Sequence, residues 1–457
     1  MLTTDTIAAI ATPIGEGGLA VIRLSGSRAL AVADRCFVAA GKSSCKPSAA
    51  ATHTIHYGHI LRQGSAVDEV LVSILRQPRT YTREDVVEVS CHGGLLPAKL
   101  VLETLLECGA RLAEPGEFTK RAFLNGRLDL AQAEAVADLI QSRTELALSA
   151  AQEQLAGKLS QRINQLRDDL MRTLAHVEAH IDFPEEDIAP HAREQLMAQL
   201  DRGIAFIDEL LRTAVEGQIL RRGIRAAIVG RPNVGKSSVL NQLLGHDRAI
   251  VSPIAGTTRD TIEETANIRG LPVVFIDTAG LRDPGDQLEQ EGIRRSRETL
   301  ARAELILHVL DASENLAPAD QVLLADFAAR KRVVIENKAD LPRRLQIEAP
   351  QELQTVSLSC RTGQGLEMLK DAIRDRVWAG GIQAEMLQVM INSRHQDALR
   401  RAREGARRAL EALQRDLTLE LVAMDLRIAA EAVGEIVGKT TTEDLLDSIF
   451  KQFCIGK

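Results

Sequence analysis

The residues with the clearest chemical purpose form a phosphate-binding pattern near the middle of the chain. The segment "AAIVGRPNVGKSSVLNQLL" is an apolar run, then G-x-x-x-x-G-K-S, then a helical run. Gly230 and Gly235 allow backbone amides to curl around a phosphate, Lys236 can reach the terminal phosphates, and Ser237 can bind Mg²⁺. A helix that starts there also points its positive end at the anion. The rest of the predicted loop comprises Asn233, Val234 and Ser238.

Two later segments supply further groups for a nucleoside triphosphate. Thr258 in "AGTTRD" is placed to close over the γ-phosphate and Mg²⁺. The buried strand "VVFIDTAG" ends at Asp277 and Gly280, which suit the second Mg²⁺ and γ-phosphate contact. The predicted contacts are Ser252, Pro253, Ile254, Ala255, Gly256, Thr257, Thr258, Asp277, Thr278, Ala279 and Gly280.

The segment "VVIENKAD" indicates that the base is guanine. The Asp340 carboxylate can accept hydrogen bonds from the ring N–H and the amino group of guanine, and adenine offers no such pair of donors. Asn337 suits the other edge of the base, and the loop "SLSCRTGQG" suits the base oxygen. The predicted base contacts are Asn337, Lys338, Ala339, Asp340, Ser359, Cys360 and Arg361. This order of motifs resembles the translation-factor-like GTPases, so we predict that the ligand is GTP.

The group that orients the attacking water is not the usual glutamine. Many small GTPases carry Gln directly after the glycine of D-x-x-G, but this chain has Leu281, which cannot hydrogen-bond to water. Glu289 in "GDQLEQEG" is a reachable carboxylate, and Asp283 and Asp286 are alternatives. Asn233 could either cap the loop or offer its amide oxygen to a large monovalent cation, and the residues alone leave both open.

The sequence pattern of the elements that must position these groups changes along the chain, from β-rich runs to apolar residues at helical spacing. The first 120 residues mix β-rich runs such as "GLAVIRLSG" and "EDVVEVS" with Gly and Pro turns, which predicts an α/β domain. Two later stretches instead show apolar residues at helical spacing. The first stripe is Leu155, Leu159, Ile163, Leu166, Leu170, Leu174, Val177 and Ile181. The second stripe is Ala402, Ala406, Leu410, Leu413, Leu417, Leu421, Met424 and Ile428.

A one-sided apolar helix needs a partner to bury its face. We therefore expect the two helical segments to pack on each other, with the phosphate-binding domain inserted between them. Two separate helical domains are the alternative. The predicted limits are 1–120 for the N-terminal domain, 121–217 and 379–457 for the two helical parts, and 218–378 for the GTP-binding domain. The fold class is multidomain, with α/β and all-α parts.

Composition favours a soluble, cytoplasmic protein of several domains. The 457 residues suggest roughly three domains of about 150 residues. No window reaches the ~18 apolar residues of a membrane span, and the N-terminus lacks a secretory signal. Six cysteines without C-x-x-C pairing argue against a zinc site and for reduced thiols. A net charge of −7 with 3% aromatic residues argues against a dedicated nucleic-acid binder.

The C-terminal stretch "FCIGK" carries another candidate for chemistry. It is a poor C-a-a-X lipidation box, because Gly456 is not aliphatic and Lys457 is not a usual last residue. Cys454 is then either a reactive thiol delivered to a site elsewhere or a buried cysteine that packs under the last turn.

Together, "GRPNVGKSS", "AIVSPIAGTTRD", "DTAGLRD" and "FCIGK" resemble the bacterial tRNA modification GTPase family MnmE, also called TrmE, over the whole length. The resemblance implies an N-terminal folate-binding and dimerisation domain, a discontinuous helical bundle and an inserted Ras-like P-loop GTPase domain. It also implies that K⁺ stimulates GTP hydrolysis when the G domains dimerise, and that Glu289 orients the water. The implied K⁺ ligands are Asn233 and the carbonyls of Ser252, Ile254 and Thr257, and those of Mg²⁺ are Ser237 and Thr258.

The same resemblance implies a folate site and a set of partners. The folate, 5-formyl-tetrahydrofolate or a relative of it, would contact Arg23, Glu88, Arg127 and Lys457. If the C-terminal helices fold back on the bundle, Cys454 would stand beside it as a catalytic thiol. Relatives can carry Lys in place of Arg127, which preserves the charge but alters the geometry. The implied partners are a second copy of the chain, tRNA and a FAD-dependent MnmG-type protein in a heterotetramer. Their product is an aminomethyl-type group, carboxymethylaminomethyl, on C5 of the wobble uridine of certain tRNAs.

Two other functions fit parts of the sequence. A regulatory GTPase that binds ribosomes or RNA without chemistry accounts for the GTP motifs but not for the folate-type residues or the terminal thiol. A membrane-remodelling GTPase is opposed by the lack of an apolar or polybasic anchor in the sequence.

The base assignment predicts that Asp340→Asn shifts nucleotide preference from GTP toward xanthosine triphosphate. The asparagine amide would face the N–H donors of guanine with a donor of its own, so GTP affinity should fall by roughly 10²-fold or more. A titration of the variant with both nucleotides measures the shift. Unchanged tight binding of GTP would remove Asp340 from the base pocket.

Overall fold

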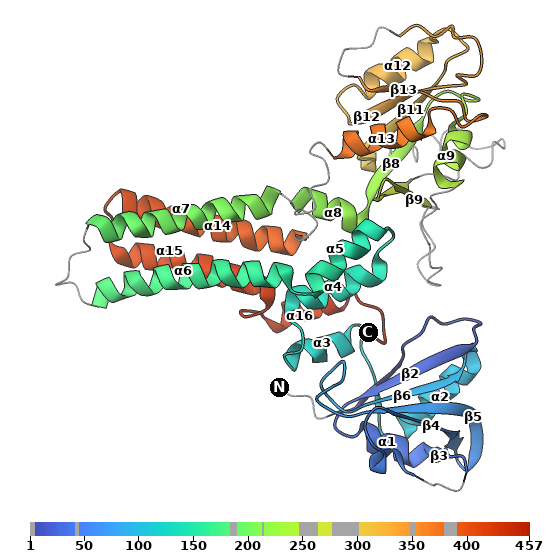
Figure 1. The fold of residues 1–457 in the computed structure, drawn as a ribbon, viewed down its shortest axis with the longest axis vertical. Coiled ribbons are helices and arrows are strands. Elements are labelled where there is room, and N and C mark those ends of the chain that lie inside the picture. Colours follow the sequence, from blue (N-terminus) through green and yellow to red (C-terminus); the bar gives the residue numbers. More distant parts are fainter. Residues whose placement is uncertain are drawn as a thin grey trace. The chain divides into compact units, whose positions relative to one another are not determined.

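The polypeptide divides into two compact units in the computed structural model (Figure 1). Unit 1 is Met1–Ala137 with Glu431–Lys457, and unit 2 is Asp138–Ala430. The structure describes residues 5–41, 45–182, 190–212, 214–245, 264–276, 301–347, 353–378 and 391–457, without the side chains of 190–192 and 214–216. No helix in these ranges is long and apolar enough to span a bilayer.

Unit 1 is built on a mixed, mainly antiparallel sheet. Its strands are β1 (Ile7–Ile10), β2 (Leu19–Ser25), β3 (Phe37–Ala39), β4 (Thr54–Arg62), β5 (Ser65–Leu75), β6 (Val86–His92) and β7 (Arg111–Leu112). They lie in the order β3-β4-β5-β6-β2-β1-β7, and β1 and β7 form the parallel pair. The predicted β-rich runs thus become β2, β5 and β6. Their alternate residues, including Ile22, Val72 and Val89, are buried beneath α1 (Ala29–Cys36) and α2 (Leu95–Glu107).

Three further helices complete unit 1, together with the short 3₁₀ helix η1 (Pro47–Ala49). They are α3 (Glu117–Leu124), α4 (Leu130–Gln141), which runs past the end of this unit, and α16 (Glu443–Phe450). Leu130 and Ala133 of α4 share an apolar cluster with Ile449, Phe450 and Phe453. The end of the chain is therefore part of the same core as residues more than three hundred positions earlier.

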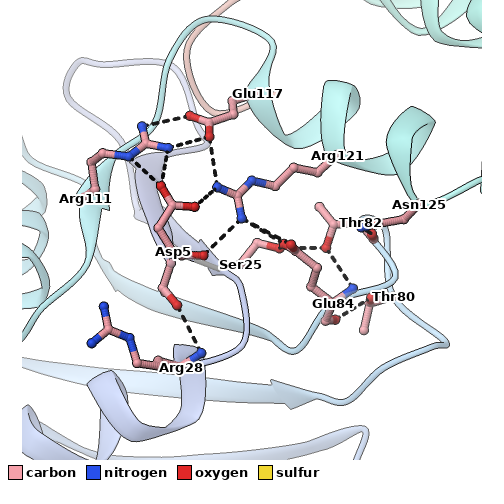
Figure 2. Close-up of polar contacts among 11 residues, drawn as sticks. Asp5, Ser25, Arg28, Thr80, Thr82, Glu84, Arg111, Glu117, Arg121 and Asn125 are labelled. Carbon is pink, nitrogen blue, oxygen red and sulfur yellow. Dashed lines mark hydrogen bonds and ion pairs between the residues drawn. The ribbon is translucent and has the colours of Figure 1, made fainter. Parts of the chain in front are cut away.

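A buried network of ion pairs holds α3 on the sheet (Figure 2). The Arg121 side chain is 3% exposed, and it donates to Asp5 at 2.7 Å, to Glu117 at 2.9 Å and to Glu84 at 3.1 Å. Arg111 on β7 also bonds to Glu117, at 2.6 Å. Burial by itself would raise the pKa of Glu117, but hydrogen bonds from Arg111, the Glu114 N–H and Arg121 bring it below its ordinary value. The carboxylates therefore stay ionised where they anchor the helix.

Unit 2 contains a second, mostly parallel sheet with the P-loop GTPase-like arrangement. Its strands are β8 (Ile224–Val229), β9 (Glu264–Ile268), β10 (Leu271–Phe275), β11 (Leu305–Asp311), β12 (Arg332–Asn337) and β13 (Thr355–Ser357). They lie in the order β13-β12-β11-β8-β10-β9, with β9 antiparallel to β10. The helices described around it are α9 (Lys236–Gly245), α12 (Pro318–Asp326) and α13 (Leu366–Val377). Because β8, β11 and β12 are parallel, the loops after their carboxyl ends meet at one edge of the sheet.

The other elements that the structure describes in unit 2 are helices. They are α5 (Glu145–Leu155), α6 (Lys158–Asp182), α7 (Pro190–Arg212), α8 (Ala214–Arg222), α14 (Ser393–Gln414) and α15 (Leu419–Val437), which runs on into unit 1. Figure 1 shows α6, α7, α14 and α15 side by side. Arg403 on α14 bonds to Asp208 on α7 at 2.8 Å, and Arg427 on α15 bonds to Glu178 on α6. The helical segments before and after the GTPase domain therefore pack on each other as predicted, and the alternative of two separate helical domains is wrong.

The first predicted apolar stripe is too long at its N-terminal end. Leu155 belongs to α5, and α6 begins only at Lys158. Gly157 between them has φ of +90°, a left-handed conformation that cannot continue a right-handed helix. Leu159, Ile163, Leu166, Leu170, Leu174 and Val177 are buried in α6 as expected, and Ile181 is half-buried near its end.

The second predicted stripe is wrong in its C-terminal half. Leu417, Leu421, Met424 and Ile428 are 46%, 44%, 51% and 39% exposed, and the opposite face of α15 is buried instead. That face comprises Val422, Ala423, Leu426, Ala429, Ala430 and Val433. The reason is a break at Asp416, whose φ is +56°, so the helical phase of α14 does not continue into α15.

Candidate functional site

The predicted phosphate-binding loop connects the end of β8 to the start of α9. Gly230 has φ of +150°, and a Cβ there would lie 2.3 Å from the Val309 carbonyl oxygen of the neighbouring strand. Asn233 is exposed and has φ of +65°, while Val234 is buried. The loop therefore curls through backbone conformations that expose its amides, directly before a helix N-terminus. Ser237 and Ser238 lie in the first turn of that helix.

Lys236 is held inside this loop by backbone oxygens. Its Nζ donates to the carbonyl of Gly230 at 3.0 Å and to that of Arg231 at 2.7 Å. Burial lowers the pKa of this ammonium group from its ordinary value. A partly buried cation without a carboxylate partner among the described residues is suited to bind the oxygens of an anion.

One hydrogen bond joins the phosphate loop to the predicted base loop. Asn337 ends β12, is 3% exposed and donates from Nδ2 to the Val234 carbonyl at 2.8 Å. A Cβ on Gly235 would lie 2.2 Å from the same Nδ2, so only glycine allows this approach. On its other side, Asn337 accepts from the Cys360 N–H at 3.4 Å. The motifs "VGKSS", "NKAD" and "SCR" therefore meet in space.

The carboxylate predicted to select the base is fixed by its neighbours. Ser359 donates from Oγ to Asp340 at 2.7 Å, and Arg361 lies 3.9 Å from the other carboxylate oxygen. The hydrogen bond from Ser359 lowers the pKa of Asp340, which stays an acceptor. Lys338 has φ of +65° and pairs with the buried Asp311, while Ala339 donates its N–H to Leu358. Burial, followed by the charge of Asp340, raises the pKa of the Cys360 thiol to about 11.

Several predicted site residues lie outside the described part of the chain. They are Ser252–Thr258, Asp277–Gly280, Leu281, Asp283, Asp286 and Glu289. Their assigned roles therefore stay predictions.

Two contacts of the phosphate loop were not predicted from the sequence. Arg231 lies inside the loop and pairs with Asp320 at 2.7 Å and with Glu314 at 3.1 Å, and Asp320 is 1% exposed. Gln242 of α9 donates to the Cys360 carbonyl at 2.9 Å. The position of Arg231 inside the motif was the available signal, but its partners are 83 and 89 residues away, Glu314 before α12 and Asp320 on it.

A second polar cluster lies in unit 1, where the C-terminal tail meets the sheet. Arg23 on β2 pairs with Glu88 on β6 at 2.8 Å, and these residues face each other in the strand register. Burial and the charge of Arg23 lower the pKa of Lys457, while the charges of Glu88 and Cys454 act in the opposite direction. Arg23, Glu88, Cys454 and Lys457 are therefore neighbours.

Specific backbone contacts fix the tail in this position. Arg23 Nη1 donates to the Gly456 carbonyl at 3.5 Å, and the Gly116 N–H donates to the Cys454 carbonyl at 3.4 Å. Gly456 has φ of +96°, and a Cβ there would lie 2.4 Å from the Ile10 carbonyl. Cys454 is exposed, whereas the side chain that packs into the core is Phe453. The alternative of a buried, packing cysteine is therefore wrong, and the thiol is accessible.

Arg127, the fourth residue of the predicted folate set, is linked to this cluster by contacts through two aromatic residues, Tyr81 and Phe118. Arg127 stacks over the ring of Tyr81 at 4.7 Å and donates to the Tyr81 carbonyl at 3.1 Å. Tyr81 packs in the same apolar cluster as Phe118, and the Arg23 guanidinium lies 5.8 Å from the Phe118 ring. The sequence did not point to Tyr81 or Phe118.

Comparisons with known proteins agree along the whole chain. The family model described as "GTP-binding protein TrmE N-terminus" matches residues 6–127, and the one described as "MnmE helical domain" matches residues 130–454. A protein of Geobacillus kaustophilus named tRNA modification GTPase MnmE is 48% identical over 466 residues, which cover 100% of both chains. Proteins of the same name from Listeria innocua and Bacillus subtilis are 47% and 45% identical over 99% of this chain, and over 99% and 100% of their own length.

A solved structure, the G domain of the T. maritima FeoB iron transporter, is 26% identical and covers 34% of this chain and 98% of that chain, with a TM-score of 0.26. The family models and the full-length relatives are decisive. This chain belongs to the tRNA modification GTPase family MnmE.

Proposed function

We propose that this protein is a K⁺-dependent GTPase that, with a FAD-containing partner, modifies C5 of the wobble uridine of certain tRNAs by adding an aminomethyl-type group. One observation carries the proposal: the chain combines a phosphate loop joined to a guanine-type base loop with a thiol-bearing polar cluster that contains its own C-terminal tail. The alternative, a regulatory GTPase without chemistry, does not account for the polar cluster that carries the thiol. The predicted domain limits, 1–120, 121–217, 218–378 and 379–457, are part of the proposal.

In the nucleotide site, the residues fit GTP by their chemistry. The Lys236 ammonium rests on two loop carbonyls, and phosphate oxygens would be stronger acceptors for it. Asp340 is ionised and offers two acceptor oxygens to guanine. Ser237 in the first turn of α9 would bind Mg²⁺ together with Thr258. Mg²⁺ bound there supplies positive charge to the phosphates, and this chain's residues orient them.

The proposed K⁺ site rests on Asn233 and on the segment that follows α9 in the sequence. Asn233 fits because it is exposed within the phosphate loop, and its side chain makes no hydrogen bond with any described residue. The further ligands, carbonyls of Ser252, Ile254 and Thr257, would come from the segment outside the described ranges. K⁺ would supply the positive charge that an arginine supplies in other GTPases, and Glu289 would hold the attacking water.

The cluster in unit 1 fits a reduced folate and a nucleophile. Arg23 and Lys457 are cations that can bind carboxylates, Glu88 can accept from the amino groups of the ring system, and Arg127 adds a third cation. A folate bound there would supply one-carbon chemistry. The exposed Cys454 thiol stands beside this site, and as a thiolate it could add to a pyrimidine ring or take a proton.

The proposed assembly is a homodimer that joins a FAD-dependent MnmG-type partner in a heterotetramer and acts on tRNA in the cytoplasm. The full-length likeness to proteins named tRNA modification GTPase supports the choice of tRNA as substrate.

The proposed function predicts that a strain without this gene lacks the aminomethyl-type modification at the wobble uridine of the affected tRNAs. Mass spectrometry of digested tRNA should detect uridines without the C5 group and their restoration by the wild-type gene. Unchanged wobble uridines would favour the alternative, a regulatory GTPase that binds ribosomes or RNA.

The cation assignment predicts faster GTP hydrolysis in K⁺ than in Na⁺, by roughly tenfold or more. A positive charge beside the negative charge that develops on the phosphates stabilises the transition state strongly where water is excluded. Asn233→Ala should abolish the difference between the two salts. Steady-state hydrolysis in matched KCl and NaCl buffers measures both. Equal rates for the wild-type protein in the two salts would contradict the assignment.

A further inference from the structure

A separate pocket of about 520 Å³ lies beside Tyr81 in unit 1. Its lining includes Arg79, Arg83, Arg127, His53, Thr80 and Tyr81. Most of these residues come from the loop between β5 and β6, and His53 directly precedes β4. Only Arg127 was singled out by the sequence.

The pocket concentrates positive charge without compensation. Arg79, Arg83 and Arg127 are all exposed, and no carboxylate lines the pocket among the residues that the structure describes. Arg83 donates to the Asn125 carbonyl at 2.9 Å, and Arg127 donates to the Tyr81 carbonyl at 3.1 Å. Arg79 makes no hydrogen bond or ion pair with any described residue. Guanidinium groups are always charged and match carboxylate geometry, so this lining suits a ligand with several carboxylates.

The loop between β5 and β6, which carries Arg79 and Arg83, is anchored by hydrogen bonds to buried residues. Residues at alternate positions face the buried network in Figure 2. Thr82 is fully buried and bonds to Ser25 at 2.6 Å and, through its carbonyl, to Asn125 at 2.7 Å. Glu84 accepts from Arg121 and Ser25. Arg79, Tyr81 and Arg83, at the intervening positions, line the pocket together with Thr80, whose hydroxyl donates to the Glu84 carbonyl at 2.7 Å, so the network fixes their backbone in advance of binding.

Two lining residues adopt strained backbone conformations. His53 and Arg83 both have φ of +59°, a region that non-glycine residues rarely occupy. Strain of this kind persists where the surroundings enforce it, and it gathers at ligand sites. The surroundings thus hold the backbone of these two lining residues in place.

A chain of side-chain contacts, which passes through the fully buried Phe118, links this pocket to the polar cluster that holds the C-terminal tail. Arg127 stacks on Tyr81, Tyr81 packs with Phe118, and Arg23 lies over Phe118. The charges of Arg127 and Arg23 both act on the Tyr81 hydroxyl. Arg127 therefore belongs both to the predicted folate set and to the lining of this pocket, so a ligand at Arg23 and Glu88 that reaches Arg127 also reaches the pocket.

We propose that this pocket binds the oligo-γ-glutamate tail of a folate, each added glutamate of which brings one more carboxylate. The proposal rests on the proposed folate site at Arg23, Glu88 and Lys457, and adds to it a preference for polyglutamylated ligands. The contacts are reversible ion pairs with Arg79 and Arg83, and Arg127 lies where the two sites join.

The test compares 5-formyl-tetrahydrofolate carrying one glutamate with the same folate carrying five, using calorimetry on the full-length protein. Two exposed ion pairs should make the pentaglutamate bind about tenfold more tightly, and less so at high salt. In Arg79→Gln/Arg83→Gln the two ligands should bind within about threefold of each other, with monoglutamate affinity unchanged. The charge-matched control is Lys46→Gln/Lys99→Gln, on exposed residues elsewhere in unit 1, which should keep the gain.

The outcomes separate this inference from the folate assignment itself. If the wild-type protein binds neither folate, the folate site is wrong. If it binds both equally, or if the double arginine variant keeps the gain, the tail pocket is wrong while the folate site stands. If the variant instead loses affinity for tRNA and keeps the gain, the arginines serve phosphates of the RNA. Arg79→Gln alone, which breaks no contact among described residues, repeats the test if the double variant is unstable.

Discussion

The nucleotide site depends on a single hydrogen bond between two loops that the fold brings together from separate strands. The phosphate loop follows β8 and the base loop follows β12, with β11 lying between those strands. Asn337 bridges them by donating to the Val234 carbonyl, and the bare Cα of Gly235 gives its amide room. A buried carbonyl left without this donor would cost about 1–3 kcal/mol. The spacing between the phosphate loop and the loop that carries Asp340 follows from this contact.

In unit 1, as in the nucleotide site, a glycine allows a close backbone approach, and here that approach positions the C-terminal tail. A glycine without side-chain obstruction, Gly456, lets the tail approach Ile10 of β1, and Phe453 buries its ring among helices. These contacts leave Cys454 exposed beside Arg23 and Lys457. The buried ion pairs of Arg121 fix α3, and the chain continues from the end of α3 to Arg127, so they also fix the backbone near that residue. The position of the thiol is thus set by the tail residues on both sides of it, Phe453 and Gly456, through their packing.

Much of this organisation could be predicted from the sequence because the signals are local. The phosphate loop, the base loop and the β-rich runs each depend on residues within about ten positions of one another. The remaining features depend on pairs far apart: Arg23 and Gly456 are 433 positions apart, and Arg231 finds Asp320 on another helix. Helix breaks were also missed, because apolar periodicity can continue across a residue such as Asp416 that leaves the helical conformation.

We propose that one chain holds two chemical centres: a GTP site in unit 2, and a thiol-bearing site in unit 1 that acts on tRNA. The most direct measurement is Cys454→Ser, assayed for GTP hydrolysis in vitro and for wobble-uridine modification in a strain that lacks the wild-type gene. Because Cys454 is exposed and contributes only its backbone carbonyl to the contact with Gly116, the variant should fold and hydrolyse GTP normally. We expect modification to be lost. Full modification by the folded variant would contradict the assignment of chemistry to the C-terminal tail.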